Sequence, residues 1–178
     1  IEQCQRMLFK HLVHYASTNN LSLVVICKTR ELYLQDREKN YFTSISQSTP
    51  FEFIRSDKGE HEFDSYLKGL ASGLIVHPAS TLGFELFSVG KKVLFGASAH
   101  ASLVNDWGIS HYFDVLPDLV KLQIDSSDTF NQACDRIRQM PISEYQDITR
   151  SPARDIISMP EGEYPHDTVC RLISGYLD

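Results

Sequence analysis

The chain has 178 residues, enough for one domain with a full core, and its hydrophobic content of 42% is ordinary for a soluble globular protein. Its 17 basic and 23 acidic residues give a net charge of −6, which argues against a general nucleic-acid-binding protein, because such proteins carry a basic surface. No apolar run approaches the ~20 residues that span a bilayer, so no transmembrane segment is predicted.

The first predicted element is a helix over residues 2–18, in which Met7, Leu8, Leu12 and Val13 share one face. The chain begins with Ile-Glu-Gln rather than Met and enters this helix at once. We therefore expect a fragment of a longer protein, from which part of an active site is missing.

Strands and helices then alternate along the chain. Residues 21–27 are a continuous apolar run rich in β-branched residues, which is typical of a strand buried on both faces in a parallel sheet. The same reasoning predicts helices at 31–45, 62–72 and 80–89, and strands at 51–54, 74–77 and 92–96. This alternation predicts an α/β fold, a Rossmann-like parallel sheet with helices on both faces.

The last third of the chain is less regular. Residues 97–125 are predicted to be irregular, with a short strand near "HYFDVL", and residues 127–139 are predicted to be helical. Four prolines between 141 and 165 predict a segment that wraps the surface, followed by a final helix at 166–177. We therefore divide the domain into a Rossmann-like part, 1–140, and a C-terminal wrapping segment with its helix, 141–178.

The stretch "LIVHPASTLGFELFSVGKKVLF" is the strongest candidate site. In an open parallel sheet, ligands bind outside the carboxyl ends of the strands, where helix N-termini offer unpaired N–H groups to phosphate. Ser80 and Thr81 stand at such a helix start, where their hydroxyls either cap the helix or bind phosphate oxygens. Gly83 leaves room where backbone and ligand, or helix and strand, come close.

Glu85 follows Thr81 by four residues, so the two share a helix face one turn apart. A carboxylate at that distance suits a ribose, because it accepts hydrogen bonds from two adjacent hydroxyls. Each residue alone has a simpler reading, a helix cap for Ser80 and a solvated side chain for Glu85. The combination, within an otherwise apolar helix, favours a nucleotide-sugar site.

Further candidates follow the ends of other predicted strands. Lys28 and Arg30 come directly after the first strand and could neutralise a departing phosphate, or be ordinary surface charges. His77 is the last residue of the predicted strand at 74–77. It could contact the nucleotide, act as an acid or base, or be a packed side chain. Ser98 belongs to a loop of small residues, 96–102, that could line the same crevice.

The four cysteines form no CxxC pair, and none has a His at metal-ligand spacing. We therefore expect reduced thiols in a cytoplasmic protein, with no metal site and no cofactor. The chain also has no GxSxG, Walker or GxGxxG motif, which argues against a serine hydrolase, a P-loop enzyme and a classical dinucleotide site.

At these residues the chain resembles the C-terminal, donor-binding half of GT-B glycosyltransferases. The resemblance rests on "VVICKTR", "FDSYLKGLASGLIVH" and "ASTLGFELFSVGKKVLFG" and covers about residues 20–115. It implies that Ser80 and Thr81 correspond to that family's Ser/Thr pair and Glu85 to its ribose-binding glutamate. It likewise implies that Lys28 and Arg30 correspond to its basic residues.

Within that superfamily, "STLGFELFSVGKKVLFG" followed by "DWGIS" looks like bacterial capsule and surface-polysaccharide transferases, including those that use CMP-linked Kdo. The resemblance implies a nucleotide-sugar donor, with CMP as the sharpest hint, and a glycan or glycolipid acceptor. It also implies an N-terminal acceptor domain absent from this chain and a location at the inner face of the membrane. A GT-B-fold nucleotide-sugar epimerase and a non-catalytic nucleotide-binding or interaction domain are the alternatives.

Overall fold

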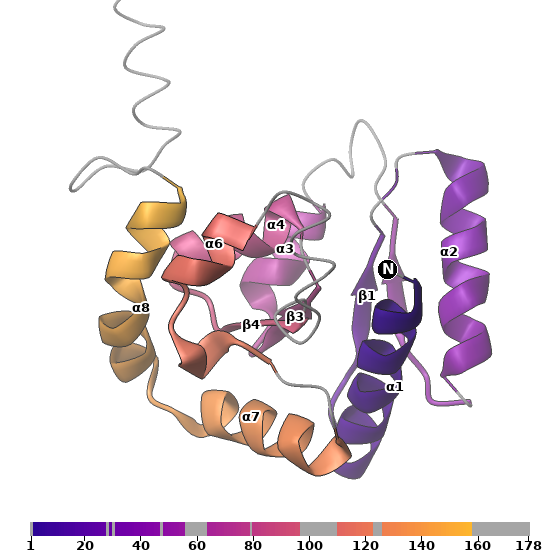
Figure 1. The fold of residues 1–178 in the computed structure, drawn as a ribbon. Helices are drawn as coiled ribbons and strands as arrows, with labels where there is room; N and C mark the ends of the chain where they lie inside the picture. Colours follow the sequence, from indigo (N-terminus) through magenta and orange to yellow (C-terminus); the bar gives the residue numbers. More distant parts are fainter. Residues whose placement is uncertain are drawn as a thin grey trace, which may run out of the picture.

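The computed structural model describes residues 2–27, 29, 31–46, 48–55, 64–78, 80–96, 110–122 and 126–157. Helices and strands alternate from α1 to β4, and the described part of the chain after β4 is helical (Figure 1). In Figure 1, α2 lies at the outer right and α8 at the outer left, while α7 runs along the bottom between α8 and α1.

The first half of the chain builds a small parallel sheet. Helix α1 (Glu2–Thr18) leads to strand β1 (Val24–Ile26), and helix α2 (Leu32–Ile45) leads to strand β2 (Glu52–Ile54). The two strands pair in parallel, from Val24 opposite Glu52 to Ile26 opposite Ile54. All three residues of β1 are only half-buried, so the apolar run at 21–27 is not the doubly buried strand that its composition predicts.

The second pair of strands lies in the middle of the molecule. Helix α3 (Asp64–Ala71) leads to strand β3 (Ile75–His77), and helix α4 (Thr81–Ser88) leads to strand β4 (Val93–Phe95). The pairing is again parallel, from Ile75 opposite Val93 to His77 opposite Phe95. All three residues of β4 are fully buried.

The predicted sheet is therefore present only in part. The parallel pairing and the alternation of strands and helices are confirmed. Within the described residues, however, the strands form two two-stranded sheets rather than one continuous sheet with helices on both faces. Each strand has only three residues, which leaves few backbone groups for a ladder to a third strand.

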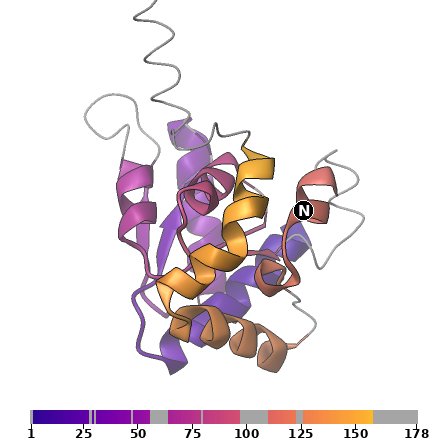
Figure 2. The same cartoon turned by 90° about the vertical axis from the view of Figure 1, so that its left-hand side faces the viewer.

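Two hydrophobic clusters accompany the two sheets. The smaller one joins α1 to α2 through Phe9, Val13 and Ile45, with Phe9 edge-on to Phe42 at 4.6 Å between ring centroids. The larger one surrounds β4 and includes fully buried residues of α4, α7 (Ser127–Gln139) and α8 (Ile142–Ile156). Figure 2 shows α8 crossing the face of the molecule on this side, above α7.

One prediction for the last third of the chain is wrong. "HYFDVL" is not a strand, because residues 110–115 form helix α6 (Ser110–Val115), followed by a short 3-10 turn, η2 (Asp118–Val120). Phe113 and Leu116 are both buried, and their spacing of three residues brings them to one side of a helix, whereas in a strand they would face opposite ways.

Residues 142–156, within the segment that its prolines predicted to wrap the surface, form helix α8. Pro141 stands at the N-cap, where no N–H donor is needed, and Pro152 lies inside the helix near its end. Tyr145, Thr149 and Ala153 are buried at four-residue intervals, so packing of one helix face outweighs the cost of Pro152. The predicted final helix at 166–177 lies outside the described residues.

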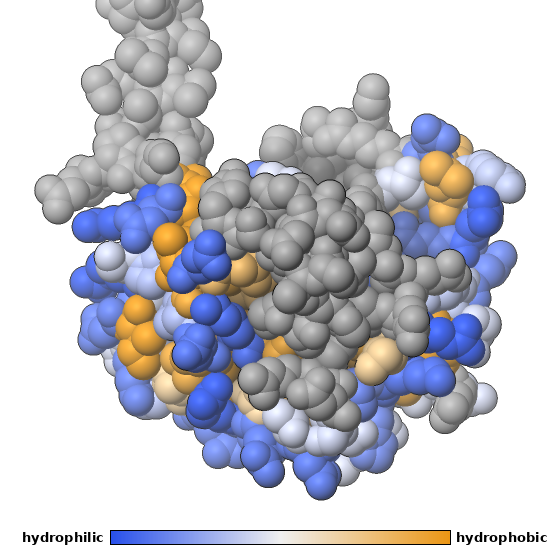
Figure 3. Space-filling view, viewed as in Figure 1, coloured by the Kyte–Doolittle hydropathy of each residue, from blue (hydrophilic) through white to orange (hydrophobic). Residues whose placement is uncertain are grey.

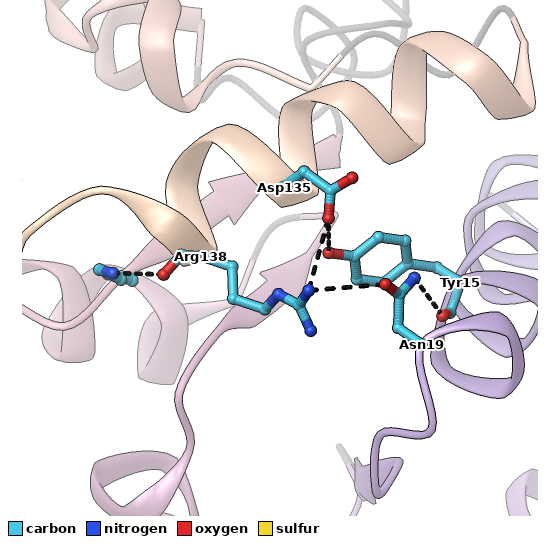
Figure 4. A network of polar contacts seen from close by, with 5 residues as sticks. Tyr15, Asn19, Asp135 and Arg138 are labelled. Carbon is cyan, nitrogen blue, oxygen red and sulfur yellow. Dashed lines mark hydrogen bonds and ion pairs between the residues drawn. The ribbon is translucent and has the colours of Figure 1, made fainter.

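A polar network holds α1 against α7 (Figure 4). The Tyr15 hydroxyl donates to Asp135 Oδ1 at 2.6 Å, and the Arg138 guanidinium lies 3.7 Å from the same oxygen. Arg138 also reaches Asn19 Oδ1 at 3.5 Å, and the Asn19 amide donates to the Tyr15 carbonyl at 3.0 Å. Every group pairs with another member of the network, which makes it a structural contact between the helices.

Apolar side chains remain on part of the surface. On the face seen in Figure 3, they alternate with polar residues over the side where Figure 1 shows α6 and α8. Val115 of α6 and Ile142 and Ile148 of α8 are each at least 41% exposed. Single exposed apolar residues of this kind are normal for a folded chain and do not by themselves mark a site.

Candidate functional site

Helix α4 begins directly after β3, at the centre of the predicted site. Ser80 is its N-cap, with extended backbone (φ −147°, ψ 147°), and its Oγ accepts the N–H of Gly83 at 3.1 Å. The capping role that the sequence allowed for Ser80 is therefore confirmed. Since the cap uses the hydroxyl oxygen as an acceptor, the O–H hydrogen can still be donated.

His77, the last residue of β3, supports the same helix start. Its Nδ1 accepts the backbone N–H of Ser80 at 3.1 Å, and the side chain is buried, with 7% exposure. The imidazole packs edge-on against Phe84 of α4 and Phe95 of β4, at 5.7 and 4.6 Å between ring centroids. Burial lowers the pKa of His77 to about 3, so the ring is neutral at physiological pH.

Two N–H groups of this first turn are left over once the described contacts are made. A helix leaves its first N–H groups without partners inside the helix. His77 takes the N–H of Ser80, and the Ser80 hydroxyl takes that of Gly83. Within the part of the chain that the structure describes, the N–H groups of Thr81 and Leu82 have no hydrogen-bond partner. Thr81 is exposed, which leaves this donor pair open to a ligand.

Glu85 is held by a residue that the sequence did not point to. The hydroxyl of Tyr66, on α3, donates to Glu85 Oε2, and this hydrogen bond, together with burial, raises the pKa of Tyr66 to about 12. Glu85 is half-buried, and Tyr66 is 41% exposed. Because α3 and α4 lie on either side of β3 in the chain, no local pattern places Tyr66 beside Glu85.

The imidazole of His77 leaves no room for a side chain at position 83. A Cβ at this position would lie 2.2 Å from His77 Nε2 and less than 2.5 Å from two further ring carbons. Of the two reasons predicted for this glycine, the structure provides the close approach of helix and strand. The His77 ring and the Gly83 backbone thus pack directly against each other.

The residues after α4 serve the fold. Gly90 has a positive φ of 78°, and the bonds from Gly90 N to Phe87 O and from Lys91 N to Leu86 O end the helix in a Schellman motif. The Lys91 ammonium donates to Leu70 O, at the end of α3. The Lys92 ammonium donates to Met140 O, at the end of α7, at 2.5 Å. These lysines cap helix carboxyl ends, where positive charge is stabilising.

The end of β1 has a different chemistry. Lys28 and Arg30, the predicted phosphate-neutralising residues, lie outside the described residues, as does Ser98. Directly before Lys28, Cys27 Sγ lies 3.2 Å from Glu38 Oε2 and 3.4 Å from the Thr29 carbonyl. Burial and the neighbouring Glu38 raise the pKa of the Cys27 thiol to about 12, so it stays a neutral thiol.

Two of the cavities on the described surface lie away from the start of α4. One, of about 250 Å³, lies between the carboxyl end of α4 and α8, with Gly90, Gln146 and Arg150 among its lining. The other, of about 380 Å³, lies between residues 16–21 and 48–50. Among the described residues, no group of three His, Cys, Asp or Glu side chains could hold a metal ion.

Comparison with known proteins gives one family. Residues 3–157 match a family described as "putative O-antigen biosynthesis protein". Neither the curated proteins nor the solved structures include a match. In the described part of the chain, no helix is both long and apolar enough to span a membrane.

Proposed function

We propose that this chain, which belongs to the family described as "putative O-antigen biosynthesis protein", binds the nucleotide-sugar donor of a glycosyltransferase. The family description connects the chain with surface-polysaccharide biosynthesis. The proposal adds the kind of molecule bound, the residues that bind it and the reaction class.

The proposal rests on one observation: at the start of α4, two backbone N–H groups are bonded within the protein and two are not. His77 and Ser80 occupy the N–H groups of Ser80 and Gly83, while those of Thr81 and Leu82 remain available within the described chain. Two adjacent N–H groups at a helix N-terminus suit a phosphate, because the helix dipole favours negative charge there. The Thr81 hydroxyl adds a third donor at the same place.

Glu85 supports a nucleotide rather than a simple phosphate. It stands one helical turn beyond Thr81, roughly 6 Å away. Tyr66 donates to one of its oxygens, which leaves the other oxygen to accept from ribose hydroxyls. A carboxylate anchored in this way loses less rotational freedom on binding, so more of the interaction energy contributes to affinity.

In the proposed reaction, an acceptor hydroxyl attacks the anomeric carbon of the donor sugar. The bond from that carbon to the phosphate oxygen breaks, and the nucleotide leaves with the electron pair. The start of α4, together with Lys28 and Arg30, stabilises the charge on the leaving phosphate. A second domain supplies the acceptor site and the base, as in a GT-B enzyme, of which this chain is the donor-binding half.

Nucleotide binding by this chain tests the proposal. We expect CMP, CDP, UDP, GDP or TDP to raise the melting temperature, since a ligand that binds only the native state stabilises it. Glu85→Ala should weaken binding of the best nucleotide ~10–100-fold in calorimetry, the value of one hydrogen bond to a charged group. Tyr66→Phe should weaken it less, because the carboxylate remains.

Glu144→Ala is the matched control, because Glu144 is an exposed glutamate on α8. It should leave affinity unchanged. Unchanged affinity in Glu85→Ala would remove the ribose role, and the absence of a shift with all five nucleotides would remove the proposed function. Hydrolysis or epimerisation of a nucleotide sugar by this chain alone, without an acceptor, would favour the epimerase alternative.

A further inference from the structure

We propose that His77 is a positioning residue: it holds the start of α4 through the Ser80 N–H, so that the N–H groups of Thr81 and Leu82 face the ligand. The ligand in this statement rests on the proposed function. The contact between His77 and the helix start does not, and it can be tested alone. The inference gives His77 a role distinct from the catalytic one expected from the sequence.

The imidazole is enclosed by three elements. His77 belongs to β3 and pairs with Phe95 of β4, a fully buried residue of the larger core. Its ring packs on Phe95, on Phe84 of α4 and against the bare Cα of Gly83. A ring in this position cannot turn without displacing core residues. Nδ1 is therefore held opposite the Ser80 N–H.

One tautomer follows from this geometry. Nδ1 accepts a hydrogen bond, so in the neutral ring the hydrogen must be on Nε2. Nε2 is buried and has no hydrogen-bond partner within the described chain. An unsatisfied buried donor costs ~1–3 kcal/mol, which a leucine at the same position would avoid. The cost indicates that the acceptor at Nδ1 has a use that an apolar side chain could not provide.

The same geometry argues against proton transfer to a substrate. The ring is 7% exposed, and Nε2 lies against Gly83, where an added Cβ would be 2.2 Å from it. A general acid or base must reach the reacting group directly or through one water. His77 instead acts through the peptide of Ser80, whose orientation determines where the following two N–H groups point.

His77→Asn and His77→Leu separate this role from simple packing. Asparagine Oδ1 occupies roughly the place of Nδ1 and can accept the Ser80 N–H, whereas leucine fills similar space without an acceptor. Without ligand, we expect hydrogen exchange at Ser80 and Gly83 to be ~10-fold faster or more in His77→Leu, and to return toward the wild-type rate in His77→Asn. The best-binding nucleotide should lose ~10-fold in affinity to the leucine variant and recover in the asparagine variant.

Each outcome supports or overturns the inference. Wild-type exchange at Ser80 in a folded His77→Leu variant would overturn it, and so would an asparagine variant no better than the leucine variant. In the wild type, ¹⁵N NMR should show a neutral ring protonated at Nε2, and the opposite tautomer would also overturn it. If no nucleotide binds the wild type, the proposed function fails, while exchange and tautomer still decide the positioning role.

Discussion

The two parallel strand pairs are built from similar sequence patterns and differ in how firmly they are buried. In the β3–β4 pair, every residue of β4 is fully buried and the larger hydrophobic cluster surrounds it. In the β1–β2 pair, β1 is half-buried throughout and only Ile54 of β2 is buried, beside a smaller cluster. The difference matters because a binding site needs a rigid support.

The strand ends show the consequence. At the end of β3, a buried imidazole contacts the next helix, a helix cap follows, and the first turn of α4 is held. At the end of β1, the Cys27 thiol contacts Glu38 and the Thr29 carbonyl, so its partners are a side chain of α2 and its own loop. Among the described residues, the β3 end is thus the one at which contacts from the core hold the start of the next helix.

The largest loss of stability is expected from a substitution that disrupts the contact between His77 and α4. Gly83→Ala should lower the free energy of unfolding by ~3 kcal/mol or more, because its Cβ would lie 2.2 Å from an enclosed ring. This loss outweighs the ~1 kcal/mol that alanine gains over glycine in a helix. Gly73→Ala is the control, since a Cβ there meets nothing within 4 Å. Chemical denaturation that found the two variants equally stable would contradict the close contact.

A matched pair of core truncations compares the two strand pairs directly. Val93→Ala, at a fully buried position of β4, should cost ~2–3 kcal/mol through lost burial and a cavity. Val25→Ala, at the half-buried centre of β1, should cost ~1 kcal/mol or less. Urea denaturation of both variants measures the difference. Equal losses would mean that the two pairs contribute similarly and that the comparison fails.

Acid should act on the end of β3 and not on that of β1. The pKa of His77 lies near 3 in the folded protein, against an ordinary value of 6.5, so between these values the unfolded chain binds a proton that the native chain does not. Stability should therefore fall as pH drops below about 6.5, by up to about 1.4 kcal/mol per pH unit from this residue. The Cys27 thiol remains neutral in this window.

The measurement is the difference in unfolding free energy between the wild type and His77→Asn from pH 7 to pH 4. Other titrating groups contribute to both proteins and cancel in the difference. The wild type should lose stability with acid more steeply than the variant. Parallel curves would show that His77 is not held neutral by burial.

The local part of the fold was predictable from the sequence. Helices predicted at 2–18 and 127–139 have those bounds, because apolar residues at helical spacing and a serine before the second helix are local signals. The same holds for the Ser80 cap. The error at 110–115 comes from judging aromatic residues by their strand preference, where burial of one helix face decided the outcome.

The sequence by itself determined the alternation of helices and strands, the parallel pairing, and the place of Ser80, Thr81 and Glu85 on the first turns of one helix. Only the tertiary structure decided that Tyr66 holds Glu85, that His77 holds Ser80 from a ring enclosed in the core, and that Lys92 caps α7. The physical reason is distance along the chain. Periodicity and caps act within a few residues, whereas Lys92 and Met140 are 48 positions apart and meet only once the elements are packed.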